Sequence, residues 1–153
     1  MLYIVENNIV QGVIRLECLF CKIAAGDVES HKIYEDEFSI AFADVRPSSE
    51  GHTIVIPKKH FAKFTEMSPD NAASLFSSVN RVAKALEKTF SLSGMNIGIN
   101  NGKAAGQEIA HVHVHLIPRR EGDGGGGMKS IVWTEPPTDN LEEIAKRIRD
   151  NFD

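Results

Sequence analysis

Five short segments of this chain have the pattern of hydrophobic and polar residues, or the β-prone composition, that is typical of a β-strand. The segments cover residues 32–35, 39–44, 51–57, 94–100 and 111–117. A turn at Asp36-Glu37 separates the first two, and Thr53 and Val55 give the third a high β propensity. A further hairpin over residues 2–5 and 9–16 is compatible with the pattern. The alternation therefore predicts a sheet of antiparallel strands.

Other segments carry hydrophobic residues at helical spacing. The longest begins at Ser68-Pro69-Asp70, which combines a capping hydroxyl, a proline at the first helical position and an acid in the first turn. Its apolar stripe then consists of Leu75, Phe76, Val79, Val82, Ala83, Leu86 and Phe90. A shorter helix has Leu141, Ile144, Ala145 and Ile148 on one side, with Thr138 or Asp139 as its cap. Residues 18–25 form a helical turn that ends at Gly26.

Together these elements predict an α+β fold, with a five-stranded antiparallel sheet and with one long and one short helix on one face of it. The length of 153 residues fits one domain with a substantial core. A net charge of −4 gives no general attraction to nucleic acid. No apolar stretch approaches the roughly 18 residues of a membrane helix, and Met1–Glu6 lacks the features of a signal peptide. We therefore expect a cytoplasmic protein.

Three of the six histidines lie in one pentapeptide, His111-Val112-His113-Val114-His115. On a strand, this alternation places all three imidazoles on one face, with roughly 6–7 Å between neighbours. Imidazole can serve as a nucleophile, a proton donor or a metal ligand near neutral pH. The pattern alone leaves two possibilities open, a metal site and a nucleophilic or phosphate-handling site.

The only two cysteines are spaced as Cys18-x-x-Cys21. In a cytoplasmic protein such a pair indicates a metal ligand set or a redox function before a structural disulfide.

The segment from Asn100 to Arg119 closely resembles the histidine triad (HIT) family of nucleotide hydrolases and transferases. Residues 20–23, 34–37, 41–45, 51–60 and 105–107 match the same family in the same order. The resemblance implies a HIT domain over residues 18–120, preceded by an N-terminal extension over residues 1–17. Residues 121–153 would form a Gly-rich loop and a C-terminal helix packed on the domain. The family fold implies a five-stranded antiparallel sheet and a homodimer.

The resemblance also assigns catalytic roles to the triad. His113 matches the histidine that attacks the α-phosphorus of a nucleotide, and the backbone carbonyl of His111 would orient it. His115 would bind a phosphate oxygen and assist the leaving group, and its identity as histidine favours hydrolysis over nucleotidyl transfer. His52 would be a further imidazole on the phosphate side.

Substrate-binding positions follow from the same match. Asn100 and Gln107 correspond to residues that hold the phosphate and ribose, and Asp44 to the carboxylate that accepts the ribose hydroxyls. The apolar slot for the base would consist of Phe20, Ile23, Phe42 and Val45. Glu108 occupies a position where several family members carry Ser or Thr. It could help to protonate the leaving group or could point to solvent.

Some HIT relatives bind zinc through a cysteine pair and two histidines. The matching residues here are Cys18, Cys21, His60 and His111. Two thiolates and two imidazoles form a closed tetrahedral site, which would brace the active-site strand without chemistry of its own. The resemblance thus implies a structural zinc and no organic cofactor.

The sequence therefore predicts a homodimeric hydrolase that cleaves phosphoramidate or acyl-adenylate conjugates of purine nucleotides at the α-phosphate. A dinucleoside polyphosphate hydrolase of the same family is a rival hypothesis, for which Lys103 and Arg119 could contact longer phosphate chains. Two further hypotheses come from different classes of protein. One is a zinc-dependent hydrolase that uses all three triad histidines as ligands, and the second is a nucleotide-binding adaptor without catalysis.

Overall fold

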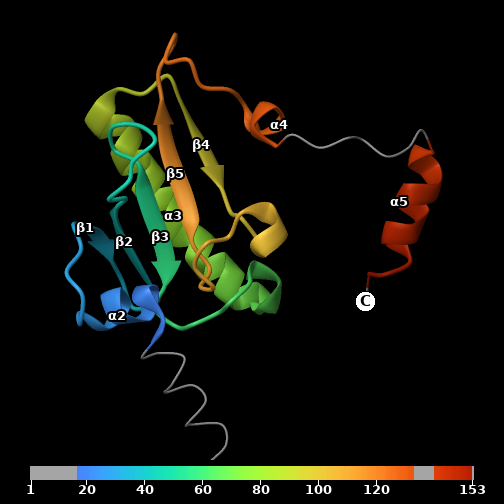
Figure 1. The fold of residues 1–153 in the computed structure, drawn as a ribbon, viewed down its shortest axis with the longest axis horizontal. Helices are drawn as coiled ribbons and strands as arrows, with labels where there is room; N and C mark the ends of the chain where they lie inside the picture. Colours follow the sequence, from blue (N-terminus) through green and yellow to red (C-terminus); the bar gives the residue numbers. More distant parts are fainter. Residues whose placement is uncertain (1–16, 133–139, 153) are drawn as a thin grey trace, which may run out of the picture.

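The computed structural model describes residues 17–132 and 140–152, and Figure 1 shows how their elements are arranged. The strands are β1 (Lys32–Glu35), β2 (Ser39–Ala43), β3 (Thr53–Pro57), β4 (Gly94–Gly98) and β5 (Val114–Arg119). The α-helices are α2 (Leu19–Ala25), α3 (Pro69–Phe90), α4 (Met128–Ile131) and α5 (Leu141–Arg149), and 3-10 turns occupy Phe64–Glu66 and Lys103–Ala105. The hairpin expected over residues 2–5 and 9–16 and the expected caps Thr138 and Asp139 lie outside the described residues.

The five strands form one antiparallel sheet in the order β1-β2-β3-β5-β4, which confirms the predicted fold class. The predicted last strand begins later than expected, at Val114 instead of His111. The His111 amide donates to the Ile109 carbonyl at 2.8 Å, and the Val112 amide donates to the Phe61 carbonyl at 2.7 Å. Residues 111–113 therefore bond to neighbouring loops before the chain joins the ladder with β3.

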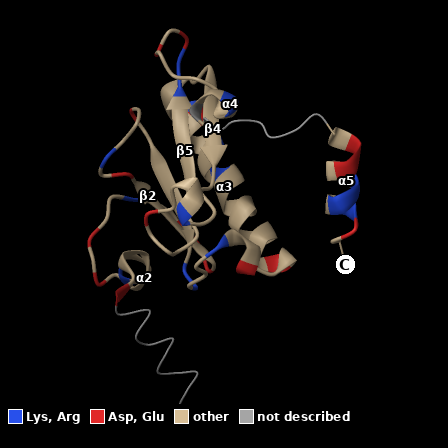
Figure 2. Ribbon diagram, turned by 45° about the vertical axis from the view of Figure 1, so that its right-hand side comes forward, with Lys and Arg blue, Asp and Glu red and all other residues tan. Residues whose placement is uncertain are grey.

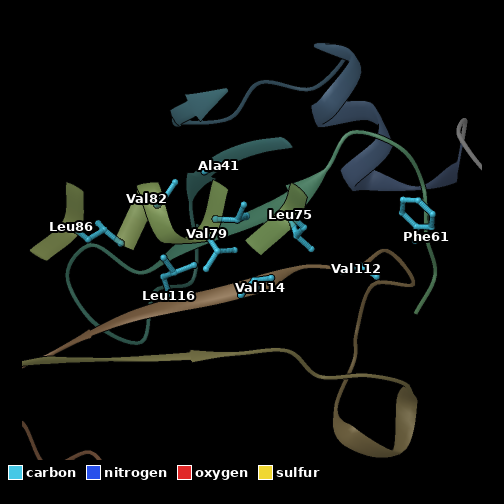
Figure 3. Close-up of a cluster of buried hydrophobic side chains, with 10 residues drawn as sticks. Ala41, Phe61, Leu75, Val79, Val82, Leu86, Val112, Val114 and Leu116 are labelled. Carbon is cyan, nitrogen blue, oxygen red and sulfur yellow. The ribbon is translucent and has the colours of Figure 1, made fainter. Parts of the chain in front are cut away.

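Helices cover both faces of the sheet, not one as the pattern suggested. Ala41 pairs with Val55 and Val55 with Val114, and these residues share a buried cluster with α3 (Figure 3). Their neighbours point to the other face, where Phe42 and Ile54 pack with Phe20 of α2. The reason is visible in β3, since Ile54-Val55-Ile56 is continuously apolar and every residue of the strand is buried.

Helix α3 begins where its capping signal predicts. The Ser68 hydroxyl accepts a hydrogen bond from the Asn71 amide at 3.3 Å, and Pro69 occupies the first helical position. Four members of its stripe are buried against the sheet, namely Leu75, Val79, Val82 and Leu86. Full burial of such side chains contributes about 1.5–3 kcal/mol each. This packing anchors the sheet and leaves its opposite face for the site.

Arg119 fixes the Gly-rich loop that follows β5. Its guanidinium donates two hydrogen bonds to Asp123, at 2.6 and 2.8 Å, one to the Asn96 side chain at 2.5 Å and one to the Gly126 carbonyl at 2.8 Å. A Cβ on Gly125 would clash with the guanidinium that these bonds hold in place, so this position favours glycine. Arg119 therefore has a structural role in the loop, which argues against its contacting a phosphate chain.

Helix α5 stands apart from the sheet in Figure 1, and Leu141, Ile148 and Phe152 are exposed. The packing of this helix on the domain stays a prediction. Local interactions stabilise the helix. The Asn140 side chain caps it by accepting from the Glu143 amide at 3.1 Å. Its acidic and basic residues, visible as red and blue segments in Figure 2, lie at its start and end and complement the helix dipole.

Within the described ranges, no helix is both long enough and apolar enough to cross a bilayer.

Candidate functional site: a nucleotide-sized cavity beside two histidine clusters

A cavity of about 590 Å³ opens on the sheet face opposite α3. Its lining comes from α2, from the end of β2, from the loop before β3 and from the segment that leads into β5. The lining residues include these positions singled out from the sequence: Phe20, Ile23, Phe42, Asp44, Val45, His52, Asn100, Glu108, His113 and His115. The fold thus gathers residues from distant parts of the sequence around one space.

One wall of the cavity is an apolar slot. Phe20 and Phe42 meet edge to face with their ring centroids 5.7 Å apart, and Ile23 is buried beside them. Val45 lies at the rim with 82% of its surface exposed. Asp44 directly precedes it, and the Asp44 Oδ1 accepts a hydrogen bond from the Arg46 amide at 2.8 Å. An apolar slot that ends at a carboxylate suits a flat base joined to a polyhydroxylated ring.

His113 has its protonation pattern fixed by the backbone. Its Nδ1 lies 2.8 Å from the carbonyl oxygen of His111. A carbonyl can only accept, so Nδ1 carries the proton and Nε2 presents a lone pair. The side chain is 6% exposed and lines the cavity. This is the orientation that a histidine nucleophile needs.

His52 and His115 form a hydrogen-bonded pair beside it. The Ser48 amide donates to His52 Nδ1 at 3.1 Å, so the proton of His52 sits on Nε2. That Nε2 lies 3.0 Å from His115 Nδ1 and donates to it, which leaves the His115 proton on Nε2. Burial, followed by the nearby His113 and His52 rings, lowers the pKa of His115 to about 4. Burial also lowers the pKa of His52. Both rings are neutral at pH 7.

A second cluster brings together Cys18, Cys21, His60 and His111, whose candidate ligand atoms all lie within 4.8 Å of one another. His111 Nδ1 is 3.4 Å from Cys18 Sγ and 3.5 Å from Cys21 Sγ, and His60 Nδ1 is 3.3 Å from Cys21 Sγ. His111 Nε2 donates to the Pro57 carbonyl at 2.8 Å, so the lone pair on Nδ1 faces the sulfur atoms. The donor set and the ring orientation both fit a tetrahedral metal ion.

A third potential ligand set, Asp44, His52 and His115, has atoms equally close together. It is poorly suited to a metal, because the Ser48 amide keeps the His52 proton on the nitrogen that faces this group. The three triad histidines do not converge either, since His111 turns toward the cysteines before β5 begins. Of the residues that the structure describes, no candidate ligand set contains all three. The rings of His111 and His113 both contact Phe20 of α2, so the triad stays on one side of the sheet, while only His113 and His115 line the cavity.

Gln107 does not line the cavity. Its side-chain amide donates to the carbonyls of Ala62 at 2.7 Å and Ile109 at 3.0 Å, and its oxygen accepts from the Gly102 amide at 2.7 Å. Both amide protons are used, so this side chain braces the loop before β5. The expected contact with phosphate has no support in this arrangement.

Two functional features could not be anticipated from the sequence. Arg46 lies at the cavity mouth, and its guanidinium approaches the Glu108 carboxylate at 3.4 Å. The Ser48 amide sets the proton positions of two histidines. The position of Arg46, two residues after Asp44, is a weak sequence signal. No sequence pattern reveals where a backbone amide will point.

Comparisons with known proteins agree with this geometry. A family model described as the HIT domain matches residues 25–122. The adenosine 5'-monophosphoramidase HNT1 of Saccharomyces cerevisiae is 43% identical over 122 residues, or 80% of this chain and 73% of that protein.

Solved structures show the same relationship. A HIT family protein from Bacillus subtilis has a TM-score of 0.79 at 39% identity. The match covers 90% of this chain and 98% of that protein's chain. A Zn-bound histidine triad protein from Mycobacterium smegmatis has a TM-score of 0.69 at 41% identity, over 72% of this chain and 80% of its own. With the fold, the histidine arrangement and the sequence match in agreement, this chain belongs to the HIT family.

Proposed function

We propose that this protein hydrolyses phosphoramidate or acyl-adenylate conjugates of purine nucleotides at the α-phosphate, through a covalent nucleotidyl-His113 intermediate. The observation that carries the proposal is the His113–His111 hydrogen bond, which places a proton on Nδ1 and leaves Nε2 as a nucleophile beside the cavity. A relative that is 43% identical is named an adenosine 5'-monophosphoramidase.

In the first step, His113 Nε2 attacks the α-phosphorus and the bond from phosphorus to the leaving atom breaks. His115 Nε2–H, oriented by the His52 hydrogen bond, gives its proton to the leaving amine, and the negative charge left on His115 is offset by the positive charge that His113 gains on bonding to phosphorus. In the second step, water attacks the phosphorus of the nucleotidyl-histidine. The water proton restores His115, and His113 regains its lone pair. The products are a nucleoside monophosphate and the free amine or acid.

The rest of the cavity supports this assignment by providing a place for each part of a nucleotide. Phe20, Ile23 and Phe42 form a slot for the base, and Asp44 would accept the ribose hydroxyls. Asn100 lines the cavity and offers a neutral donor to the phosphate.

We further infer that Cys18, Cys21, His60 and His111 hold a structural zinc ion. When bound, zinc would supply four-coordinate bracing and no open position for a reacting water. The residues of the chain itself orient the nucleophile, since the His111 ring is held in place while its backbone carbonyl accepts a hydrogen bond from His113. The Zn-bound neighbour from M. smegmatis supports the inference.

We also infer a homodimer. The family resemblance implies one, and β4 lies at an edge of the sheet with Ile97 exposed. Pairing of this edge with a second copy would cover its free backbone groups. Sedimentation analysis would test the state directly.

The proposed activity is tested by AMP release from an adenosine phosphoramidate and from a diadenosine polyphosphate, for wild type and His113→Ala. We expect turnover of the phosphoramidate and a loss of at least about 10⁴-fold in the variant, which is typical when a nucleophile is removed. Acid quenching and mass spectrometry should show AMP attached to His113. Turnover that persists in the variant would overturn the mechanism, as would abolition of turnover by a chelator that leaves the fold intact.

Tight nucleotide binding without turnover, unchanged by His113→Ala, would instead identify a nucleotide-binding adaptor.

A further inference from the structure

Two opposite charges meet across the mouth of the cavity. Arg46 lies in the loop after β2, and Glu108 lies in the segment before β5. Their charged groups are 3.4 Å apart, and their side chains are 84% and 77% exposed. Both residues line the cavity that contains His113 and His115. A pair this exposed is weak, so either member can exchange its partner for a charged group on a ligand.

The charges around this cavity do not balance. Among the described residues that line it, three are acidic, Glu29, Asp44 and Glu108, and Arg46 alone is a permanent cation. Burial lowers the pKa of both His52 and His115, so these two rings do not offset the difference at pH 7. The potential inside is therefore negative, which disfavours leaving groups that carry several negative charges.

Glu108 lies on the side where the leaving group departs. His115 supplies the proton to that group, and the Glu108 carboxylate is close enough to counter part of the lowering of the His115 pKa. The base slot is built from other elements, α2 and β2. A carboxylate placed here contacts what is attached to the α-phosphate, not the nucleoside.

We propose that Glu108 selects the leaving group by charge, favouring amines and aminoacyl groups that carry an ammonium and disfavouring carboxylate, sulfate or polyphosphate groups. Arg46 competes with the substrate's ammonium for the same carboxylate. This inference rests on the proposed hydrolysis at the α-phosphate and narrows its substrate class. It also gives Glu108 a definite role, as a specificity-determining residue at the exposed mouth of the cavity.

The test uses three adenosine 5'-phosphoramidates whose arms have equal length and differ in charge. The amines are ethylenediamine, with a terminal ammonium, propylamine, which is neutral, and β-alanine, with a terminal carboxylate. All three present the same P–N bond to His113. For the wild type, we expect kcat/KM to fall in that order, by about tenfold from first to last, the scale of exposed charge contacts. Sodium chloride at about 0.5 M should reduce the differences in kcat/KM among the three substrates, because salt screens exposed charges.

Glu108→Gln should reduce the tenfold range to less than about twofold, while Arg46→Gln should widen it. Glu50→Gln is the matched control, since Glu50 is an exposed carboxylate paired with an arginine, Arg120 at 3.1 Å, outside the cavity lining. It should leave the range unchanged.

A range that survives Glu108→Gln would overturn the inference, and so would equal rates with all three arms. In both cases AMP release that depends on His113 would leave the proposed function standing. No AMP release from any of the three substrates would instead refute the proposed function itself.

Discussion

Each of the two histidine clusters contains a histidine of the segment 111–115, yet the two are prepared for different chemistry. In the thiol-imidazole cluster of Cys18, Cys21, His60 and His111, the Pro57 carbonyl accepts a hydrogen bond from His111 Nε2–H, and the lone pair on Nδ1 faces the cysteines. The open cluster is the pair of His52 and His115 beside the cavity. There the Ser48 amide donates to His52 Nδ1, so His52 Nε2–H donates to His115 and His115 Nε2–H is left for the cavity. One histidine is prepared as a metal ligand and the other as a proton donor. A single backbone carbonyl or amide behind each ring decides which.

Among changes that leave His113 in place, disrupting the thiol-imidazole cluster should have the largest effect on stability and activity. Cys21→Ser removes the sulfur that lies near both His60 and His111. We expect loss of bound zinc by elemental analysis and a melting temperature lower by about 10 °C, since a tightly bound ion contributes about 4 kcal/mol. Loosening of His111 should reduce kcat about 10–100-fold, the usual cost of losing an orienting partner.

The control for this change is His31→Asn, because His31 is exposed and lies outside both clusters. It should keep full zinc content and activity. A Cys21→Ser protein that retains stoichiometric zinc and the wild-type melting temperature would contradict the assignment of this cluster.

Disrupting the open cluster should reduce kcat less than disrupting the thiol-imidazole cluster does, by an amount that depends on the leaving group. His52→Asn removes the donor that keeps the His115 proton on Nε2. With an amine leaving group, we expect kcat to fall about tenfold, within the range for one general-acid contribution. With an acyl-adenylate, whose carboxylate departs without a proton, kcat should change less than about twofold by the same reasoning. An equal loss with both substrates would indicate a general structural defect and not a role in positioning His115.

The contrast between the clusters also shows what the sequence could and could not predict. The spacing of the histidines and cysteines, together with the family resemblance, pointed to the four candidate metal ligands and to His113. The resemblance placed the His111 ring in the metal set, whereas the spacing alone could not, because that placement depends on the turn at residues 109–111 and on the Pro57 carbonyl. The helix cap at Ser68 was predictable because it is encoded by neighbouring residues. The contact of α2 with the far face of the sheet joins segments distant in the sequence, so only the family resemblance, which grouped Phe20 with Phe42, pointed to it.

The pH dependence offers a milder test of the open cluster. Because burial holds the pKa of His115 near 4, this ring stays neutral from pH 7 down to about pH 5. We expect its contribution to kcat/KM to be constant over that range and to fall as the pH approaches 4, because protonation of Nδ1 removes the acceptor of the His52 hydrogen bond that orients the ring. Stability should change in the same direction for a different reason. Below about pH 6.5 the unfolded chain binds protons at this histidine that the folded chain does not, so acid destabilises the fold.

A matched measurement with His52→Asn separates these effects. Loss of the neighbouring imidazole removes one of the groups that lower the His115 pKa, so the acid limb of the profile should move to higher pH. An acid limb that stays in place would show that another group controls it.

The smallest effect on activity is expected at Gln107, which braces the loop before β5. The family resemblance assigns it to the phosphate, whereas its amide is fully bonded to the backbone of Gly102, Ala62 and Ile109. If it is a brace, Gln107→Ala should cost about 1–3 kcal/mol of unfolding free energy, because it leaves partly buried backbone groups without partners. Its kcat should then fall only about two- to threefold, since no transition-state contact is lost. A loss of about 100-fold in kcat with unchanged stability would show that Gln107 turns toward the phosphate when substrate binds, and that the brace exists only without it.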